Sequence, residues 1–539
     1  ETARSHGAAR SDRAMPTPRE QQTPVLRRPA ATTSMVKKPK AFVVRAGIAS
    51  APGPRNLHEA VHDWKPALDK VLPEHVPFGM QMLEDMSKRG VVVTTHYSGT
   101  GAAEMATATI LPGRVIFHGA CDLNPTCQKV LLNHGPECTA EHVSADIMAR
   151  CPKHIVDQLR ADLKKYQQEA EALVSASKQP GHKGILRDVS LKWVDAAMVT
   201  LHAWTPRRED MIDCLRHNAE CPAFPARAST STSGRFHLEI DGINCQPWSK
   251  AGKRLGWLDD RSLPCLVLCR TIVIVQPDAV CIECTPGVDF ETIRKLLIGY
   301  RGDYAITCPT DFGRPVSRKR MYMWFDRLLS VCHVYREVST ILNVASRSLL
   351  VGPEIFLSAS GNEIRRQYHT MACQASRKPD GPPVPKPVLR RLRSKQPPTC
   401  KLRVRDVLPD GLRKRYLEHR TEVGQARSSH GSGISREKCV VVDINQTASW
   451  SGAPQSRCVP TIMRSSTLVA LFESEDEDRI LLPSEMPGVH GLQIPPRVLA
   501  ELHPKEVGSL VGNSMHVAQI GLFIQYALAT RSYLHAHAS

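Results

Sequence analysis

The sequence predicts an α/β fold built on a Rossmann-like sheet. A β-branched run at residues 91–95 leads straight into a glycine-rich turn, and residues 102–109 follow as a good helix start. Residues 115–120 have the composition of a second strand, and Asp122 stands at its end, 21 positions after Gly101. Strand, glycine turn, helix, strand and acid in this order are typical of a βαβ unit that binds a nucleotide-like cofactor.

The later segments continue this alternation with one interruption. Residues 155–234 are interpreted as an insertion, and no catalytic role is predicted for them. Beyond the first βαβ unit, hydrophobic periodicity predicts helices at 126–133, 155–177, 191–204 and within 507–529, and strands at 235–240, 270–275, 279–283 and 321–325.

Length and composition indicate two or three domains and no membrane span. The chain has 539 residues, and no apolar run reaches the length that crosses a bilayer. Its 17 cysteines are irregularly spaced, which argues against a disulfide framework. Cys281 and Cys284 have the spacing of a zinc-ligand pair, but no second pair is suitably placed, so no metal is expected. Nothing in the sequence indicates an obligate protein partner.

Positive charge gathers in two segments of the chain. Of the net charge of +18, residues 1–56 contribute +8 (11 Lys/Arg, 3 Asp/Glu) and residues 386–420 contribute +9 (12 Lys/Arg, 3 Asp/Glu). A localised basic stretch is what a polyanion such as nucleic acid attracts. Residues 1–60 are predicted to be a disordered basic tail, for which a merely solvated tail is an equally good interpretation. The basic runs at 37–40 and 390–395 both fit a nuclear signal.

Cys245 is the strongest candidate for a reactive side chain. It follows the predicted strand at 235–240 and lies in the turn Asp241-Gly-Ile-Asn-Cys-Gln-Pro-Trp-Ser249. A packing cysteine lies more often inside an apolar run, where burial makes the thiol inert. Polar neighbours and the basic residues at 250–254 favour a thiolate at this position.

Six further short motifs lie around this loop. Tyr97-Ser98-Gly99-Thr100-Gly101 precedes it, and five follow it: Asp260-Arg261-Ser262, Glu283-Cys284-Thr285, the 313–320 run, the 481–495 run and Gly512-Asn513-Ser514. In this order the seven motifs resemble those of the cytosine-5 DNA methyltransferases, whose nucleophile loop usually reads Gly-Pro-Pro-Cys-Gln-Pro-Phe-Ser. The resemblance runs from about residue 91 to about residue 530.

The resemblance implies the domain organisation. It implies an S-adenosylmethionine-dependent methyltransferase sheet together with a smaller, irregular target-recognition domain, to which composition adds the disordered basic tail. The expected ranges are 88–326 for the catalytic domain, 327–457 for the target-recognition region and 458–535 for the return to the catalytic domain.

It also implies a role for each motif residue. Cys245 would be the nucleophile that adds to carbon 6 of cytosine, and Glu283 would donate toward ring nitrogen 3. Arg318 and Arg320 would hold the base and the neighbouring phosphate. The residues expected to bind S-adenosylmethionine are Tyr97, Ser98, Gly99, Thr100, Gly101, Asp122, Asp146, Ile147 and Asn513, and those expected to bind nucleic acid are Ser249, Arg390, Arg391 and Arg393.

Several positions depart from the family pattern and leave alternatives open. Asn244 replaces the usual proline before the nucleophile, Cys284 and Thr285 follow Glu283 in place of Asn-Val, and Val316 replaces a glutamine. The sequence favours a DNA methyltransferase. A transfer-RNA methyltransferase of the same architecture and a catalytically silent nucleic-acid-binding relative remain as alternatives. The βαβ pattern alone would also fit a nicotinamide enzyme. Cys245 and its companion motifs argue against that class of enzyme.

Overall fold

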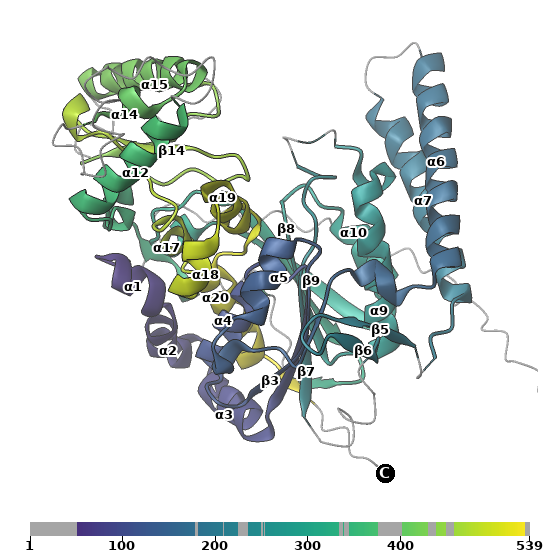
Figure 1. Cartoon of the computed structure of the whole chain (residues 1–539). Coiled ribbons are helices and arrows are strands. Elements are labelled where there is room, and N and C mark those ends of the chain that lie inside the picture. The colour runs from purple at the N-terminus through teal and green to yellow at the C-terminus, as the bar shows by residue number, and fades with distance from the viewer. Residues whose placement is uncertain are drawn as a thin grey trace, which may run out of the picture. The chain divides into compact units, whose positions relative to one another are not determined.

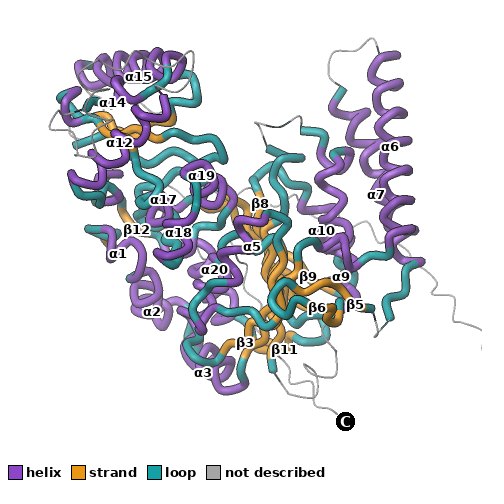
Figure 2. The backbone as a smooth tube through the Cα atoms, in the orientation of Figure 1, coloured by secondary structure: helices purple, strands orange, loops and turns teal. Residues whose placement is uncertain are grey.

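A mixed seven-stranded sheet forms the centre of the computed structural model, as Figures 1 and 2 show. The structure describes residues 51–177, 182–207, 210–224, 235–249, 252, 254–333, 338, 344–375, 402–429, 438–448 and 457–533. The strand order is β4-β3-β2-β7-β8-β10-β9. The strands are β2 (Val91–His96), β3 (Val115–Cys121), β4 (His142–Ser144), β7 (Phe236–Gly242), β8 (Ala279–Cys284), β9 (Tyr300–Thr307) and β10 (Arg320–Arg327).

The sheet reverses its winding direction at β2. The chain builds outward from β2 to β3 and β4, then returns to the other side of β2 with β7 and continues to β8, and all these pairs are parallel. β10 is antiparallel to both of its neighbours. In open α/β sheets, ligands bind outside the carboxyl ends of the strands at such a reversal. The fold therefore points to the ends of β2 and β7.

Helices cover both faces of the sheet, because successive residues of a buried strand face opposite sides. On β8, Cys281 belongs to one core cluster, whereas Val280, Ile282 and Cys284 belong to the other. The helices that contribute to the first cluster are α2 (Trp64–His75), α3 (Gly79–Arg89), α4 (Ala102–Ile110), α5 (Pro125–Leu132), α17 (Met486–Val489), α18 (Pro496–Glu501), α19 (Pro504–Asn513) and α20 (Val517–Ala529), and those of the second are α6 (Lys153–Ala176), α7 (Lys183–Ala203), α9 (Leu263–Val275) and α10 (Phe290–Leu296).

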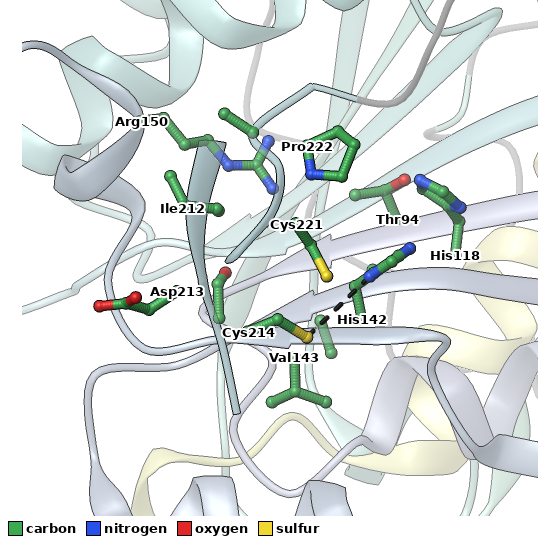
Figure 3. Close-up of a pocket in the computed structure, with 14 residues that line it drawn as sticks. Thr94, His118, His142, Val143, Arg150, Ile212, Asp213, Cys214, Cys221 and Pro222 are labelled. Atoms are coloured by element: carbon green, nitrogen blue, oxygen red, sulfur yellow. Dashed lines mark hydrogen bonds between the residues drawn. The ribbon is translucent and has the colours of Figure 1, made fainter. Parts of the chain in front are cut away.

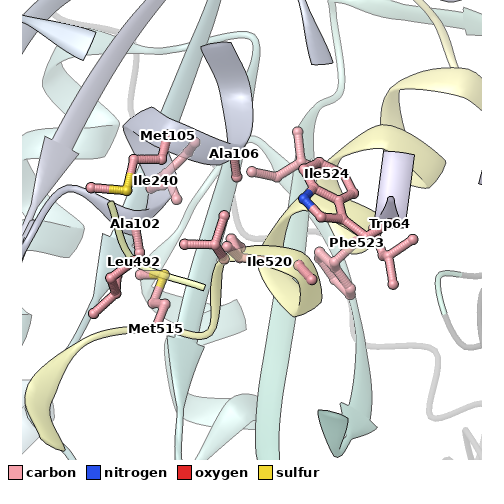
Figure 4. Packing of buried hydrophobic residues seen from close by; sticks show 14 of the residues in the cluster. Trp64, Ala102, Met105, Ala106, Ile240, Leu492, Met515, Ile520, Phe523 and Ile524 are labelled. Atoms are coloured by element: carbon pink, nitrogen blue, oxygen red, sulfur yellow. The ribbon is translucent and has the colours of Figure 1, made fainter. Parts of the chain in front are cut away.

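The last helix, α20, lies in the middle of the first core. All thirteen of its residues are buried, and it packs against α4 and α2 (Figure 4). A Cβ added at Gly521 would lie 2.3 Å from Cη2 of Trp64, so glycine is needed for the indole to reach the helix backbone. One helical stretch of the described residues, Pro504–Ala529, is long and apolar enough to cross a membrane, and 89% of its apolar window is buried within the protein.

The insertion forms two hairpins. α6 and α7 pack against each other and against the start of the 256–262 segment. The short strands β5 (Met211–Cys214) and β6 (Ala219–Pro222) then form an antiparallel ribbon. The amide of Leu215 donates to the carbonyl of Val143 at 2.7 Å, which joins this ribbon to the sheet edge at β4.

A third, smaller core lies in the region between β10 and the C-terminal helices. It gathers apolar side chains from three helices and a three-stranded sheet, and we call it the small core. Its elements are α12 (Gly361–Ala375), α14 (Val404–Val407), α15 (Asp410–Ser428), β13 (Val440–Asp443), β14 (Leu468–Leu471) and β15 (Arg479–Ile480). The remaining described strands and helix are β1 (Ala51–Pro52), β11 (Val331–His333), β12 (Arg347–Ser348), β16 (Ser532–Tyr533) and α1 (Leu57–His62).

The α/β prediction is confirmed, and three of its details are wrong. Residues 270–275 belong to α9 rather than to a strand, because Pro264 fits the first helical turn and a long buried apolar run overrides the β propensity of its end. The tail does not extend to residue 60, since α1 begins at Leu57 with Asn56 as its N-cap. The boundary at residue 457 divides the small core, since β13 pairs with β14 beyond it.

Candidate active site

The candidate site lies along the carboxyl ends of the parallel strands. The loop 97–101 follows β2, Asp122 follows β3, and Asp146 follows β4. Cys245 lies three residues beyond β7, and Glu283 is the penultimate residue of β8. These positions share one edge because their strands are parallel neighbours, so the structure brings together residues spread over 187 positions of sequence (97 to 283, inclusive).

The glycine loop is fastened to the end of β3. The amide of Gly99 donates to Oδ2 of Asp122 at 2.8 Å, and the amide of Asn124 donates to Oδ1 at 2.8 Å. Burial raises the pKa of the Asp122 carboxyl. Gly99 and Gly101 have φ values of +58° and +77°, a region that glycine adopts without strain. The loop therefore presents its backbone closely to whatever binds above Asp122.

The C-terminal motif closes this loop from the far end of the chain. The hydroxyls of Thr100 and Ser514 lie 2.6 Å apart. A Cβ added at Gly99 would lie 3.8 Å from the carbonyl oxygen of Asn513, which is exposed at the end of α19. The first and last motifs of the sequence thus meet in one place.

Cys245 lies in a tight turn and is half-buried. Its carbonyl accepts hydrogen bonds from the amides of Trp248 at 3.1 Å and Ser249 at 2.9 Å. Trp248 is buried in the second core, where its ring meets Trp257 edge-on at 5.5 Å between centroids. Packing of one turn residue into the core thereby holds the turn that carries the thiol.

A second brace comes from the segment before α9. Arg261 donates to both carboxylate oxygens of buried Asp259, through Nε at 2.7 Å and Nη2 at 2.6 Å, and its Nη1 donates to the side chain of Gln246. Gln167 of α6 donates to Oδ1 of Asp260 at 3.0 Å. The insertion thus supports this brace, although the sequence predicted no part for it in the site.

Glu283 lies beside the end of β7. It is paired in register with Gly242, and a Cβ on that glycine would lie 3.8 Å from Oε2 of Glu283 and 3.3 Å from the carbonyl oxygen of Tyr97. Nε of Arg320 lies 3.0 Å from Oε1 of Glu283. A small residue at 242 thus lets the ends of β2, β7 and β8 converge around one carboxylate and one guanidinium.

Arg318 has a different placement from Arg320. It is buried, and burial lowers the pKa of its guanidinium to about 10. Nη2 donates to the carbonyl of Ser514 at 2.7 Å and Nη1 to that of Gly512 at 3.2 Å. These contacts attach the C-terminal motif to the site, whereas contact of Arg318 with a base stays a prediction.

The other predicted site residues have structural placements of their own. The Tyr97 backbone has φ +53°, and its side chain packs against the second core. Ser98 is buried and accepts from the amide of Cys121 at 3.0 Å. Asp146 caps the turn after β4 by accepting from the amide of Met148, while Ile147 is buried in the second core.

The residues predicted to bind nucleic acid lie in two parts of the chain. Ser249 lies in the nucleophile turn, partly exposed, and its contact with nucleic acid stays a prediction. Arg390, Arg391 and Arg393 lie outside the described residues.

Comparison with solved structures finds methyltransferases. A Dnmt2 methyltransferase of S. pombe is 15% identical, with 81% of this chain and 98% of that chain covered and a TM-score of 0.37. The Entamoeba histolytica methyltransferase EhMeth is 13% identical, with coverage of 81% and 98% and a TM-score of 0.36. An E. coli prophage protein described as a DNA modification methyltransferase is 13% identical, with coverage of 82% and 98% and a TM-score of 0.37. No protein-family model and no curated protein matches the chain.

Sequence reasoning missed a buried ionisable cluster beneath the site. Nδ1 of His96 lies 2.6 Å from Oε1 of Glu239 and 3.0 Å from Oδ1 of Asp241, and all three side chains are buried. Burial raises the pKa of Asp241 to about 7. The signal was present in the sequence, since His237, Glu239 and Asp241 alternate along β7 and so share one face of a strand.

A second buried carboxylate lies beneath the glycine loop. Thr95 donates to Oε1 of Glu104 at 2.6 Å, and the hydroxyls of Thr95 and Ser98 lie 2.6 Å apart. Burial raises the pKa of Glu104 to about 7. The polar layer below the cofactor loop is therefore held by hydrogen bonds and charge as well as by packing.

Proposed function

We propose that this protein is an S-adenosylmethionine-dependent DNA (cytosine-5) methyltransferase. The observation that carries the proposal is the convergence of Cys245 after β7, Glu283 at the end of β8 and Arg320 at the start of β10, beside the glycine loop of β2. A thiol, an acid and a guanidinium at one sheet edge supply a nucleophile, a proton donor and an anion-binding group.

Cys245 would act as the nucleophile. Its thiolate forms a bond from Sγ to carbon 6 of cytosine, which makes carbon 5 electron-rich and able to accept a methyl group. Transfer of the carbon 5 proton to water and elimination of the thiolate then restore the ring. A base in duplex DNA must leave the stack to reach the sulfur, so base flipping is part of the proposal.

Glu283 and Arg320 would stabilise the charge that this addition creates. Negative charge develops toward ring nitrogen 3, where the carboxyl group of Glu283 would donate a proton or a hydrogen bond in the transition state. The 3.0 Å ion pair with Arg320 fixes the orientation of the carboxyl group. Arg318 would act as a positioning residue, because its described contacts are the carbonyls of Gly512 and Ser514.

The loop after β2 fits S-adenosylmethionine. Both glycines of the loop have left-handed backbones and no side chain, so a ligand can approach the loop closely, and Asp122 offers a carboxylate at the end of the next strand for ribose hydroxyls. When bound, the cofactor supplies the methyl group. Asn513, at the end of α19, would close the site above Gly99.

The choice of DNA over transfer RNA depends on the target-recognition region. Its size resembles DNA-modifying members of the family more than compact transfer-RNA members. A nuclear location belongs to the same proposal, since it depends on the basic runs at 37–40 and 390–395, which lie outside the described residues.

Transfer of a labelled methyl group tests the proposal. The full-length protein is incubated with labelled S-adenosylmethionine and, separately, with duplex DNA and a transfer-RNA pool. Incorporation into DNA is expected, together with a denaturant-resistant adduct on DNA that contains 5-fluorocytosine. Cys245→Ser should abolish both, because a hydroxyl ionises far less than a thiol, while cofactor affinity stays nearly unchanged.

Cys138→Ser is the matched control. Burial raises the pKa of the Cys138 thiol to about 12, and its side chain packs in the first core and belongs to none of the site motifs, so activity should persist. Incorporation into transfer RNA alone would replace the DNA assignment by its nearest alternative. Neither incorporation nor adduct on either substrate would reject catalysis and favour a silent binding protein.

A further inference from the structure

A cluster of two cysteines and two histidines lies at the β4 edge of the sheet. His142 begins β4, Cys214 ends β5, His217 lies in the turn of the ribbon, and Cys221 lies on β6. One ligand atom from each residue can be chosen so that all four lie within 4.8 Å of one another. In Figure 3 the sulfurs of Cys214 and Cys221 and the ring of His142 point into the same small pocket.

The ribbon geometry explains why the cysteines meet. Cys214 is paired with Ala219, and Ile212 with Cys221, so both sulfurs leave the same face of the two-stranded ribbon. Asp213 and Glu220 are paired with each other on the opposite face and are exposed. The ribbon turns its cysteine face toward β4, where Leu215 bonds Val143.

The distances in the cluster are those of a tetrahedral metal site. Cys214 Sγ lies 3.6 Å from Nδ1 of His217 and 4.0 Å from Nδ1 of His142, and Nδ1 of His217 lies 3.2 Å from Sγ of Cys221. Bond lengths of about 2.3 Å to sulfur and about 2.0 Å to nitrogen at a tetrahedral zinc separate sulfur from nitrogen by about 3.5 Å. The four donors therefore surround a point that zinc can occupy with little movement.

We propose that His142, Cys214, His217 and Cys221 bind one structural zinc ion. Two thiolates and two neutral imidazoles balance the charge of Zn²⁺, and a complete set of four protein ligands leaves no position for a substrate. Binding releases the two thiol protons to solvent. This inference does not depend on the proposed methyltransferase activity.

The site differs from the cysteine pair singled out in the sequence. Cys281 and Cys284 lie three positions apart on β8 and belong to opposite core clusters, so they cannot share an ion. The zinc proposal depends instead on the Cys-x-x-His-x-x-x-Cys spacing of the ribbon. Its fourth ligand, His142, lies 72 positions upstream of Cys214. The expectation of no metal is accordingly revised.

The ion would fasten the insertion to the sheet. α6 and α7 lie between His142 and Cys214 in sequence, so the metal closes the chain around the whole helical hairpin. β4 ends at Ser144, two residues before Asp146, so the ion would bind to the same short strand that leads to a residue expected to bind S-adenosylmethionine. Closing a long loop stabilises a fold chiefly by restricting the unfolded chain.

Metal analysis of the full-length protein tests the proposal. After purification under reducing conditions and dialysis, about one zinc per chain is expected. In the double variant Cys214→Ser and Cys221→Ser, the zinc content per chain should fall at least about tenfold, because both thiolate ligands are removed. Asp213→Asn is the matched control, since it lies on the same strand but on the opposite face, and it should retain the ion.

Cobalt substitution keeps the test decisive if the double variant folds poorly. Wild-type protein stripped with a chelator and reloaded with Co²⁺ should show the visible bands of tetrahedral cobalt and the near-ultraviolet band of thiolate ligation. His217→Ala is exposed enough to spare the fold and should weaken those bands. Wild-type protein without zinc and without cobalt bands overturns the proposal, as does a Cys214–Cys221 disulfide that persists under reducing conditions.

Discussion

Charged side chains gather in two places: at the carboxyl ends of the strands of the large sheet, which we call the rim, and in the small core. The two places differ in how many hydrogen bonds these side chains form within the protein. In the small core, Asp478 accepts from the Tyr416 hydroxyl, from Arg420 and from the Phe472 amide, all at 2.7 Å. On the rim, Oε1 of Glu283 has an ion-pair partner in Arg320 but no hydrogen bond among the described residues. The oxygens of Asp478 are occupied by partners within the fold, whereas Oε1 of Glu283 can still accept a hydrogen bond from a ligand.

The difference also changes how the basic segment is interpreted. Within residues 386–420, four described arginines are paired with carboxylates: Arg403 with Asp476, Arg405 with Glu475, Arg413 with Asp410 and Arg420 with Asp478. A guanidinium in an ion pair must first share or exchange its carboxylate partner to hold a phosphate. Net charge counted along a sequence therefore overstates the part of this segment that is free to bind nucleic acid.

The largest expected effect is on the rim. Glu283→Gln should slow methyl transfer by two to four orders of magnitude, about 3 to 5 kcal/mol in activation free energy, because one positioned proton donor is removed. Affinity for nucleic acid should change little, since an amide still forms a hydrogen bond to the base. Single-turnover rates and binding measured on the same substrate separate the two quantities.

Glu291→Gln provides the comparison for this rim carboxylate. Glu291 is exposed on α10 and paired with Arg294, so its loss should leave turnover unchanged. Near-normal turnover of Glu283→Gln would show that Glu283 is an ordinary strand-end carboxylate. Its role would then be structural, as the role of Asp478 is in the small core.

The next effect belongs to the small core. Asp478→Ala should lower the free energy of unfolding by about 3 kcal/mol, because the buried Tyr416 hydroxyl and the Phe472 amide lose their acceptor and Arg420 loses its partner. Denaturant unfolding measures the loss. Cofactor affinity should be retained, and a parallel loss of cofactor binding would contradict the separation of the two regions.

The rim was predictable from sequence to a much greater degree than the small core. Glycine turns, strand-end acids and the cysteine turn are local signals, and strand pairing does the rest by placing them along one edge. The alignment of Cys245 with Glu283 needed only that β7 and β8 be neighbours. The small core carries no such signals, since its helices and strands come from segments separated by basic, proline-rich sequence.

What escaped the sequence were contacts between distant segments. The zinc cluster joins His142 to a ribbon inside an insertion for which no role was expected. Arg318 was predicted from its motif, but its contacts with Gly512 and Ser514 depend on how the C-terminus returns. Helix α9 was partly mistaken for a strand because local propensity favours β structure, whereas its length and the burial of eight of its thirteen residues favour a helix.

A smaller effect should appear in the pH dependence of stability. Burial raises the pKa of Glu104 from 4.5 to about 7, so the folded protein holds this proton more tightly than the unfolded chain. The resulting stabilisation is complete below pH 4.5 and disappears as pH rises through about 7. Between about pH 5 and pH 8, wild type should lose about 2 kcal/mol more stability than Glu104→Gln.

Glu84→Gln is the control for that measurement. Glu84 is exposed and pairs with Lys88 at 2.8 Å, which lowers its carboxyl pKa, so removing it should not flatten the profile in this range. Chemical denaturation at a series of pH values gives both curves. Parallel curves for wild type and Glu104→Gln would show that Glu104 does not bind its proton more tightly in the folded protein than in the unfolded chain.

The smallest expected effect is on nucleic-acid binding by the basic segment. It compares arginines that have a carboxylate partner with arginines that lie outside the described residues. Replacing Arg390, Arg391 and Arg393 with alanine should reduce the slope of log affinity against log salt by about 0.9 for each phosphate of duplex DNA that the variant no longer neutralises. Replacing Arg403 and Arg405 should leave the slope unchanged, because their partners are Asp476 and Glu475. Binding isotherms at several salt concentrations compare the two variants directly. If the Arg403 and Arg405 variant alone flattened the slope, carboxylate pairing would not exclude phosphate binding, and the contrast between filled and unfilled charges would fail for the small core.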